Sequence, residues 1–156
     1  MTDYPNTSIR RLYAAIVTGA VVFCVSPALA GSDLEVREAW VRATVPGQPV
    51  AGAYLTLKSA SPLRLISARS EVARAVELHQ MSLKDGVMRM RRLESLDLPG
   101  GQEVKLAPGG IHLMLLDLKQ PLSAGEEIEL DLVTRAPGQE SRTTHIRVPV
   151  RTEPPR

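Results

Sequence analysis

Apolar and polar residues alternate with a period of two in several short segments of the chain. In residues 128–132 the apolar side chains occupy the even positions and the acidic ones the odd positions, and residues 53–57 alternate in the same way. Such alternation is typical of strands that bury one face. Further strand candidates are residues 40–43, 104–106, 111–118 and 144–150. Many short strands predict an all-β sandwich or barrel.

Turn signals separate these segments and support the same interpretation. They are Pro46-Gly47, Ser61-Pro62, Asp85-Gly86, Pro99-Gly100-Gly101, Pro108-Gly109-Gly110, Ala124-Gly125 and Pro137-Gly138. Only residues 70–78 compete with it, because their Glu, Ala, Arg and Leu side chains favour a helical turn.

The N-terminal residues have the order of a secretory signal peptide. Arg10 and Arg11 precede an apolar run, residues 12–25, and small residues follow at 28 and 30. The run is shorter than the roughly 20 residues that span a bilayer. We therefore expect residues 1–30 to be a cleaved signal peptide, by the Sec or the twin-arginine route. The product, residues 31–156, is then a single exported domain without membrane insertion.

The residue composition excludes several classes of site and function. The only cysteine, Cys24, lies in the predicted signal peptide, and bulky Phe23 and Val25 make it a poor site for lipid attachment. A mature domain without cysteine excludes disulfides, thiolate nucleophiles, iron–sulfur centres and blue-copper sites. A net charge of +2 gives no electrostatic footprint for nucleic acid. No Gly-x-Ser-x-Gly motif supports a hydrolase, so we expect a binding protein rather than an enzyme.

Histidine and methionine carry the distinctive pattern. His79-Gln-Met81 and His112-Leu-Met114 repeat one three-residue step. Residues two apart on a strand point to the same face, so each step projects an imidazole and a thioether side by side.

The Asp85-Gly86 dipeptide predicts where one of these steps lies. It is a strong signal for a two-residue hairpin turn. With that turn, Met81 lies opposite Met90, and His79 lies diagonally from Met90 on the same face. Diagonal neighbours are about 7–8 Å apart, which two long side chains can bridge through one atom.

Imidazoles and thioethers without thiolate form a soft donor set that suits Cu(I) rather than zinc. The alternative is that methionines fill gaps in a core poor in aromatic residues. We assign Met88, opposite Leu83, to packing of that kind, and His145 to the surface or to a structural position.

The spacing resembles the copper-binding signature of the periplasmic CuA copper-chaperone family, PCu(A)C. His79 is followed after ten residues by Met90, after a further 21 by His112, and after one more by Met114. The likeness extends over about residues 36–150. It implies a cupredoxin-like Greek-key β-sandwich that binds Cu(I) through these four side chains, with Met81 as a possible auxiliary ligand. A second copper site is not expected, because His145 is the only His or Met after Met114.

The resemblance also implies a function. It indicates a periplasmic metallochaperone that delivers copper toward the CuA centre of cytochrome c oxidase, with that subunit and other periplasmic copper-assembly proteins as partners. A copper-buffering or resistance protein without a dedicated target, and a metal-free structural β-sandwich, remain as alternatives.

Overall fold

The computed structural model describes residues 34–155, which form ten β-strands and no helix. Within these residues, no helix is therefore long and apolar enough to cross a membrane. The predicted signal peptide, residues 1–30, lies outside the described part. The strands are β1 (Leu34–Arg42), β2 (Val50–Ser59), β3 (Leu63–Arg69), β4 (Ala73–Lys84), β5 (Val87–Leu93), β6 (Leu96–Leu98), β7 (Glu103–Leu106), β8 (Ile111–Leu118), β9 (Glu127–Arg135) and β10 (Ser141–Arg151).

Seven of the strands pair into a closed ring, in the order β4-β8-β2-β1-β10-β9-β3 and back to β4. The β1–β10 pair is parallel, whereas the others are antiparallel. Ala68 of β3 pairs with Val76 of β4 and completes the ring. The all-β prediction is confirmed, and the closed ring leaves none of these seven strands as a free edge.

The alternation seen in the sequence turns one face of each ring strand inward. The buried residues form one apolar cluster to which every ring strand contributes. Among its fully enclosed members are Leu57, Leu65, Leu113, Leu130 and Val148. Aliphatic side chains dominate this core, as expected for a chain with so few aromatic residues. The core holds β4 and β8 side by side.

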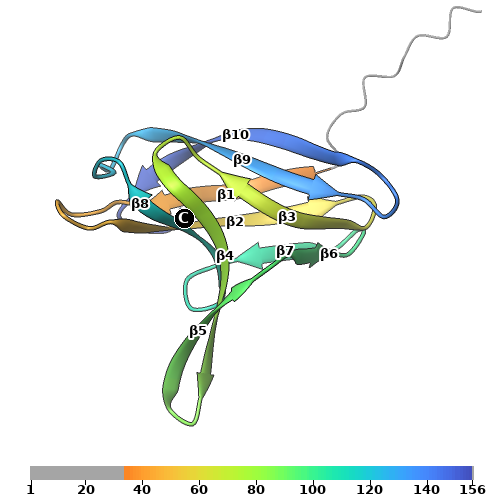
Figure 1. Cartoon of the computed structure of the whole chain (residues 1–156), viewed down its shortest axis with the longest axis horizontal. Coiled ribbons are helices and arrows are strands. Elements are labelled where there is room, and N and C mark those ends of the chain that lie inside the picture. Colours follow the sequence, from red (N-terminus) through yellow and green to blue (C-terminus); the bar gives the residue numbers. More distant parts are fainter. Residues whose placement is uncertain (1–33, 156) are drawn as a thin grey trace, which may run out of the picture.

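The β4–β5 hairpin projects from the barrel (Figure 1). β4 pairs with β8 only as far as Gln80, which lies opposite Ile111, and continues beyond it with β5 alone. Asp85 and Gly86 both have positive φ, 54° and 75°, as a type I′ turn requires. The predicted register is confirmed, since Met81 pairs with Met90.

The competing helical interpretation does not hold, and two strands were not predicted. Residues 70–78 form no helical turn, because most of them enter β4 and pair with β8. β3 carries a register irregularity between Leu65 and Ser67, so its buried Leu65 and Ala68 are three apart and the alternation is hidden. β6 has only three residues.

Candidate metal centre

The four predicted ligands lie on one face of three neighbouring strands. His79 of β4 and His112 of β8 are paired directly across the ladder. Met114 lies one same-face step along β8, opposite Glu77 of β4. Met90 of β5 lies beside His79 at the base of the projecting hairpin. The structure therefore brings the four residues of the signature onto one continuous surface.

His79 is held between a carboxylate and a thioether. Its Nε2 lies 2.9 Å from Glu77 Oε2, and its Nδ1 lies 3.0 Å from Met90 Sδ. A carboxylate accepts hydrogen bonds, so Nε2 carries a hydrogen and Nδ1 of the neutral ring keeps its lone pair. Two electron-pair donors, one nitrogen and one sulfur, thus converge.

These two atoms are suitably spaced for a shared ion. With bonds of about 2.0 Å to nitrogen and 2.3 Å to sulfur, an ion could contact both at an angle of about 90°. Their separation of 3.0 Å needs little change for this to occur. A donor set of neutral imidazole and thioether suits Cu(I) better than the harder biological metal ions.

His112 is oriented by a backbone carbonyl. Its Nδ1 lies 3.1 Å from the Gly110 oxygen, which also accepts the backbone N–H of Met81 at 3.1 Å. A carbonyl can only accept, so Nδ1 donates and Nε2 is left with the lone pair that binds metals. The turn before β8 therefore fixes both the tautomer of His112 and the start of the hairpin.

An aromatic wall covers the other side of His112. The centres of the His112 and Tyr54 rings are 6.3 Å apart, and Trp40 packs against Tyr54 at 4.7 Å. On its open side His112 faces His79, with ring centres 6.0 Å apart. His112 is consequently only 4% exposed, while Met90 is 47% exposed. The site therefore has a buried end against the outer face of the barrel and an open end on the hairpin.

Gly52 leaves the space that the Tyr54 ring of this aromatic wall occupies. It lies on β2 directly opposite Met114, and a Cβ at this position would come within 2.5 Å of the Tyr54 hydroxyl oxygen. Only a glycine therefore lets the Tyr54 ring lie where it does.

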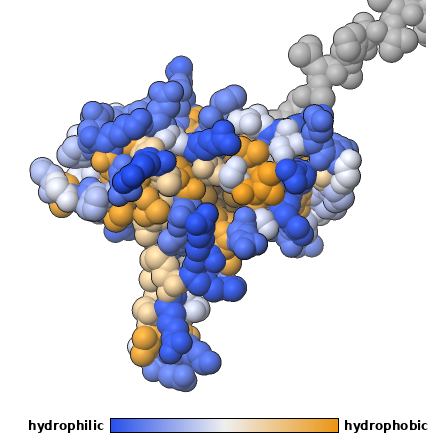
Figure 2. Space-filling model, in the orientation of Figure 1, coloured by the Kyte–Doolittle hydropathy of each residue, from blue (hydrophilic) through white to orange (hydrophobic). Residues whose placement is uncertain are grey.

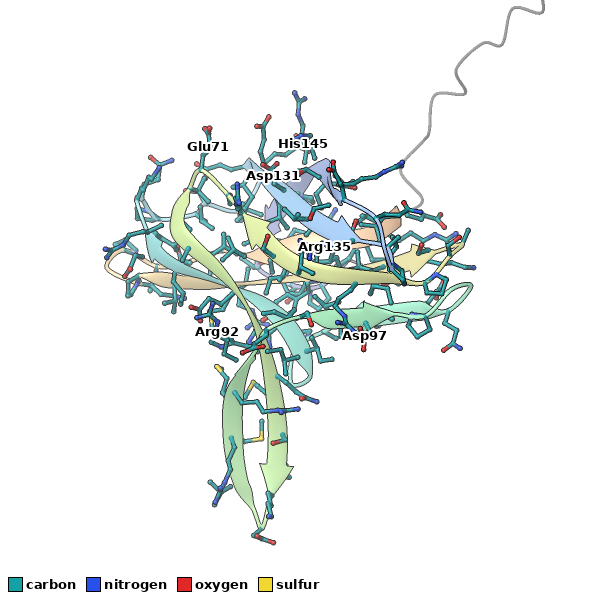
Figure 3. The ribbon with its side chains drawn as sticks, turned by 45° about the vertical axis from the view of Figure 1, so that its right-hand side comes forward. Glu71, Arg92, Asp97, Asp131, Arg135 and His145 are labelled. Carbon is teal, nitrogen blue, oxygen red and sulfur yellow. The ribbon has the colours of Figure 1, made fainter. Side chains whose placement is uncertain are left out.

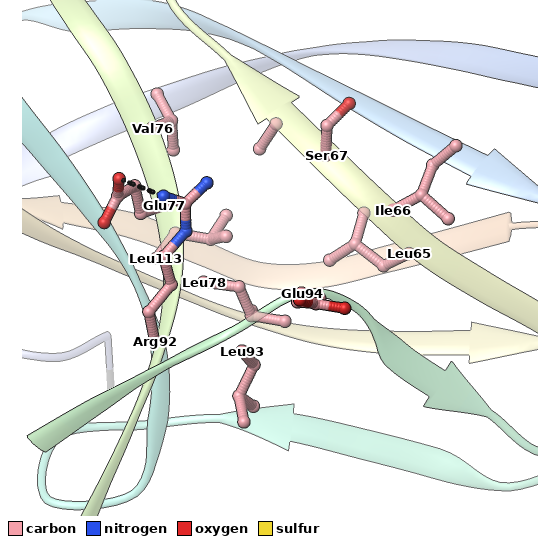
Figure 4. A pocket seen from close by; sticks show the side chains of 11 residues that line it. Leu65, Ile66, Ser67, Val76, Glu77, Leu78, Arg92, Leu93, Glu94 and Leu113 are labelled. Carbon is pink, nitrogen blue, oxygen red and sulfur yellow. Dashed lines mark ion pairs between the residues drawn. The ribbon is translucent and has the colours of Figure 1, made fainter.

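Glu77 is a site residue that the sequence reasoning missed. Besides His79 it binds Arg92, whose Nη1 lies 3.0 Å from Oε1 (Figure 4). The signal was available, since Glu77 is two residues before His79 on the same strand face. The adjacent pocket, about 70 Å³, is lined by neither His nor Met and is separate from the donor atoms.

The assignment of Met88 to packing is wrong. Its side chain is 51% exposed on the projecting hairpin, where sulfur atoms are visible along the ribbon (Figure 3). Met81, opposite Met90, is partly buried and lies near enough to remain a candidate auxiliary ligand.

His145 is a surface residue, as expected. It is paired with Asp131 through Nδ1 and Oδ1 at 2.6 Å, at the opposite end of the molecule from the hairpin (Figure 3). Within residues 34–155, no group of three or more His, Cys, Asp or Glu side chains could hold a metal ion.

Comparison with protein families gives one match over most of the described chain. The model of a family described as "Putative lipoprotein LpqE-like" matches residues 34–150. A protein of Leifsonia xyli subsp. xyli, described as "Putative lipoprotein Lxx21020", is 32% identical over 108 residues. The aligned region covers 69% of this chain and 65% of that relative.

Solved structures of PCuAC domains and of DR1885 are similar in fold to this chain. The copper-bound PCuAC domain from PmoF2 superposes with a TM-score of 0.62 at 26% identity, over 78% of this chain and 94% of that one. The Cu(I) form of DR1885 from Deinococcus radiodurans gives 0.57 at 27%, over 80% and 82%. Its apo form gives 0.58 at 26%, over 96% and 97%. The cupredoxin-like fold of the PCuAC type is thereby confirmed.

Proposed function

The chain belongs to the putative lipoprotein LpqE-like family, and from that premise we propose that it is a Cu(I)-binding metallochaperone. The ligands are His79, Met90, His112 and Met114. The observation that carries the proposal is the 3.0 Å approach of His79 Nδ1 to Met90 Sδ, with the ring tautomer set by Glu77. Similarity to domains whose structures contain copper or Cu(I) supports it.

The donor set matches the ion in charge as well as in softness. Two imidazoles and two thioethers are neutral, so they compensate the lost hydration of a monovalent ion without a carboxylate in the coordination sphere. Zn(II) prefers thiolate, imidazole and carboxylate, and seldom uses methionine. Selection of Cu(I) over Zn(II) follows from this difference.

Transfer rather than storage is favoured by the open end of the site. Met90 contributes its sulfur from an exposed strand, while His112 is enclosed by the aromatic wall. An acceptor can therefore reach the copper from the hairpin side, where Met90 is exposed, while His112 stays enclosed. We propose the CuA-bearing subunit of cytochrome c oxidase as the acceptor, alongside other copper-assembly proteins.

The chain acts outside the cytoplasm in this proposal, in the periplasm of a cell with two membranes. The matched family and the Leifsonia relative are both described as lipoproteins, which supports export by residues 1–30. Because Phe23 precedes Cys24, we propose cleavage as a signal peptide and a product, residues 31–156, without a lipid anchor.

The test is an anaerobic Cu(I) titration of the exported chain against a chromogenic chelator. We expect one tightly bound Cu(I) per chain, little competition from Zn(II), and a large loss of affinity in His112→Ala and in Met114→Leu. Met88→Leu is the matched control, since it removes a thioether outside the four ligands. Retention of Zn(II) in preference to Cu(I), or an unchanged affinity in Met114→Leu, would refute the assignment.

A second measurement separates a chaperone from a copper buffer. The Cu(I)-loaded chain is mixed with the copper-free CuA domain, and the metal content of both proteins is followed after separation. Transfer supports delivery, whereas retention of copper by the chain favours buffering.

A further inference from the structure

The projecting hairpin carries a strip of exposed side chains that the proposed site does not use. Met88 is 51% exposed and Leu83 is 68% exposed, and they face each other across the ladder. Met81 and Met90 form the next same-face pair toward the barrel. Hydrophobic residues lie along one side of the hairpin and hydrophilic residues along the other (Figure 2). Packing does not explain the exposed thioethers of Met88 and Met90, because no element among residues 34–155 covers this side of the hairpin.

The ladder register spaces the thioethers regularly toward the buried site. Met88 is the diagonal neighbour of Met81, and diagonal neighbours on one sheet face are about 7–8 Å apart, a span that long side chains bridge. Met81 lies directly opposite Met90. Met90 in turn contacts Nδ1 of His79 at 3.0 Å. The strip therefore runs without interruption from solvent to the first histidine.

The surrounding charges favour a monovalent ion on this strip. Arg89 and Arg91 lie on the reverse face of the hairpin, and Arg91 is held there by Gln80 through two hydrogen bonds of 3.1 and 2.7 Å. Repulsion from these cations is twice as strong for a divalent ion as for a monovalent one. Neutral thioethers moreover provide no charge to offset it, so soft monovalent Cu(I) fits best.

We propose that Met81, Met88 and Met90 form an outer, weak Cu(I) site through which the ion enters and leaves the site at His79. The proposal rests on the proposed Cu(I) function and adds a route to it. Met90 is shared: the ion exchanges the sulfurs of Met88 and Met81 for Nδ1 of His79 while Met90 stays bound. The copper remains Cu(I), no electron moves, and no bond to hydrogen breaks.

The test measures how fast Cu(I) passes from the loaded, full exported chain to a small chromogenic chelator in an anaerobic stopped-flow instrument. A small chelator needs no protein docking surface, so only the metal route is tested. Met88→Leu keeps the apolar area and removes the sulfur. We expect it to slow transfer on the order of tenfold, equivalent to about 1.4 kcal/mol on the barrier, with the equilibrium affinity unchanged. Leu83→Ala is the control on the same strip, and it should leave the rate unchanged.

Silver(I) supplies an independent readout of the outer site, as a diamagnetic soft ion. In the chain with ¹³C-labelled methionine methyl groups, the first equivalent should shift Met90 and Met114. Excess Ag(I) should then shift Met88 and Met81.

Each outcome separates the route from the tight site. A normal transfer rate in Met88→Leu, or a Met88 methyl unmoved by excess Ag(I), overturns the outer site and leaves the proposed function standing. A loss of equilibrium affinity in Met88→Leu also overturns it, because Met88 would then belong to the tight site. A chain that binds no Cu(I) at all refutes the proposed function and the outer site together.

Discussion

Replacing Glu77 by glutamine tests whether His79 binds copper through Nδ1. The Glu77 carboxylate accepts the Nε2 hydrogen of His79 at 2.9 Å and so keeps the lone pair on the nitrogen that faces Met90. Glu77→Gln preserves the size of the side chain and removes its charge. The amide can also present its NH₂ group to Nε2, which would move the ring hydrogen onto Nδ1 and block it.

The expected magnitude follows from the position of Glu77. Loss of an outer partner of a metal-binding histidine typically costs 10- to 100-fold in metal affinity. The Glu77 side chain is 21% exposed, and Arg92 shares its carboxylate, so solvent and a cation already weaken its effect. We therefore expect the low end, about tenfold or about 1.4 kcal/mol in Cu(I) binding free energy.

The assay is the anaerobic chelator competition, with unfolding by denaturant as a check that the barrel is intact. Asp131→Asn is a matched control, because Asp131 makes an equivalent contact of 2.6 Å with His145, far from the site (Figure 3). It should leave the affinity unchanged. An affinity within about twofold of the unmodified chain in Glu77→Gln would refute the reasoning, since Nδ1 of His79 would then not depend on this carboxylate.

Three further outcomes are expected. Apparent Cu(I) affinity should fall on acidification, because protons compete with the ion for His79 and His112; a pH-independent affinity in chelator titrations would mean that sulfur alone binds copper. Gly86→Ala should destabilise the hairpin by about 1–2 kcal/mol, since φ is 75° and no atom lies within 4 Å of the added Cβ; amide hydrogen exchange across the turn would report it. Leu115→Ala should cost about 2–5 kcal/mol in the free energy of unfolding, because Leu115 is fully buried; a cost as small as that of exposed Leu83→Ala would contradict the observed core.

The sequence predicted the hairpin register because a two-residue turn leaves only one pairing open. Asp85-Gly86 determines every partner from Lys84–Val87 to Met81–Met90, so local chemistry was sufficient. Strands with unbroken alternation, such as residues 128–132 in β9, were equally accessible. β3 was not, because its irregularity hides the buried positions. Residues 70–78 were misjudged because pairing with β8 outweighs their helix propensity.

In the candidate site, too, some features were predicted from the sequence and others were not. The two His-x-Met steps and the resemblance to the family signature predicted His79 and His112 as ligands, and the ladder places these two residues opposite each other. The exposure of Met88 could not be predicted from its neighbour Leu83, because both belong to a ribbon that extends beyond Ile111, the first residue of β8. How far a hairpin projects depends on where the third strand stops, and that is a tertiary fact.

The start of β8 marks the boundary between the enclosed ligand, His112, and the exposed ligand, Met90. His112 belongs to a strand of the closed ring, is oriented by the Gly110 carbonyl and is covered by Tyr54 on the outer face of the barrel. Met90 lies on a two-stranded ribbon, an arrangement that is marginally stable by itself and that opens at a lower free energy than a packed core. The ribbon can therefore move with its sulfur atoms while the barrel and His112 stay in place. A copper carrier needs this combination, because ligands that were all rigid and buried would bind the ion tightly and hand it on slowly.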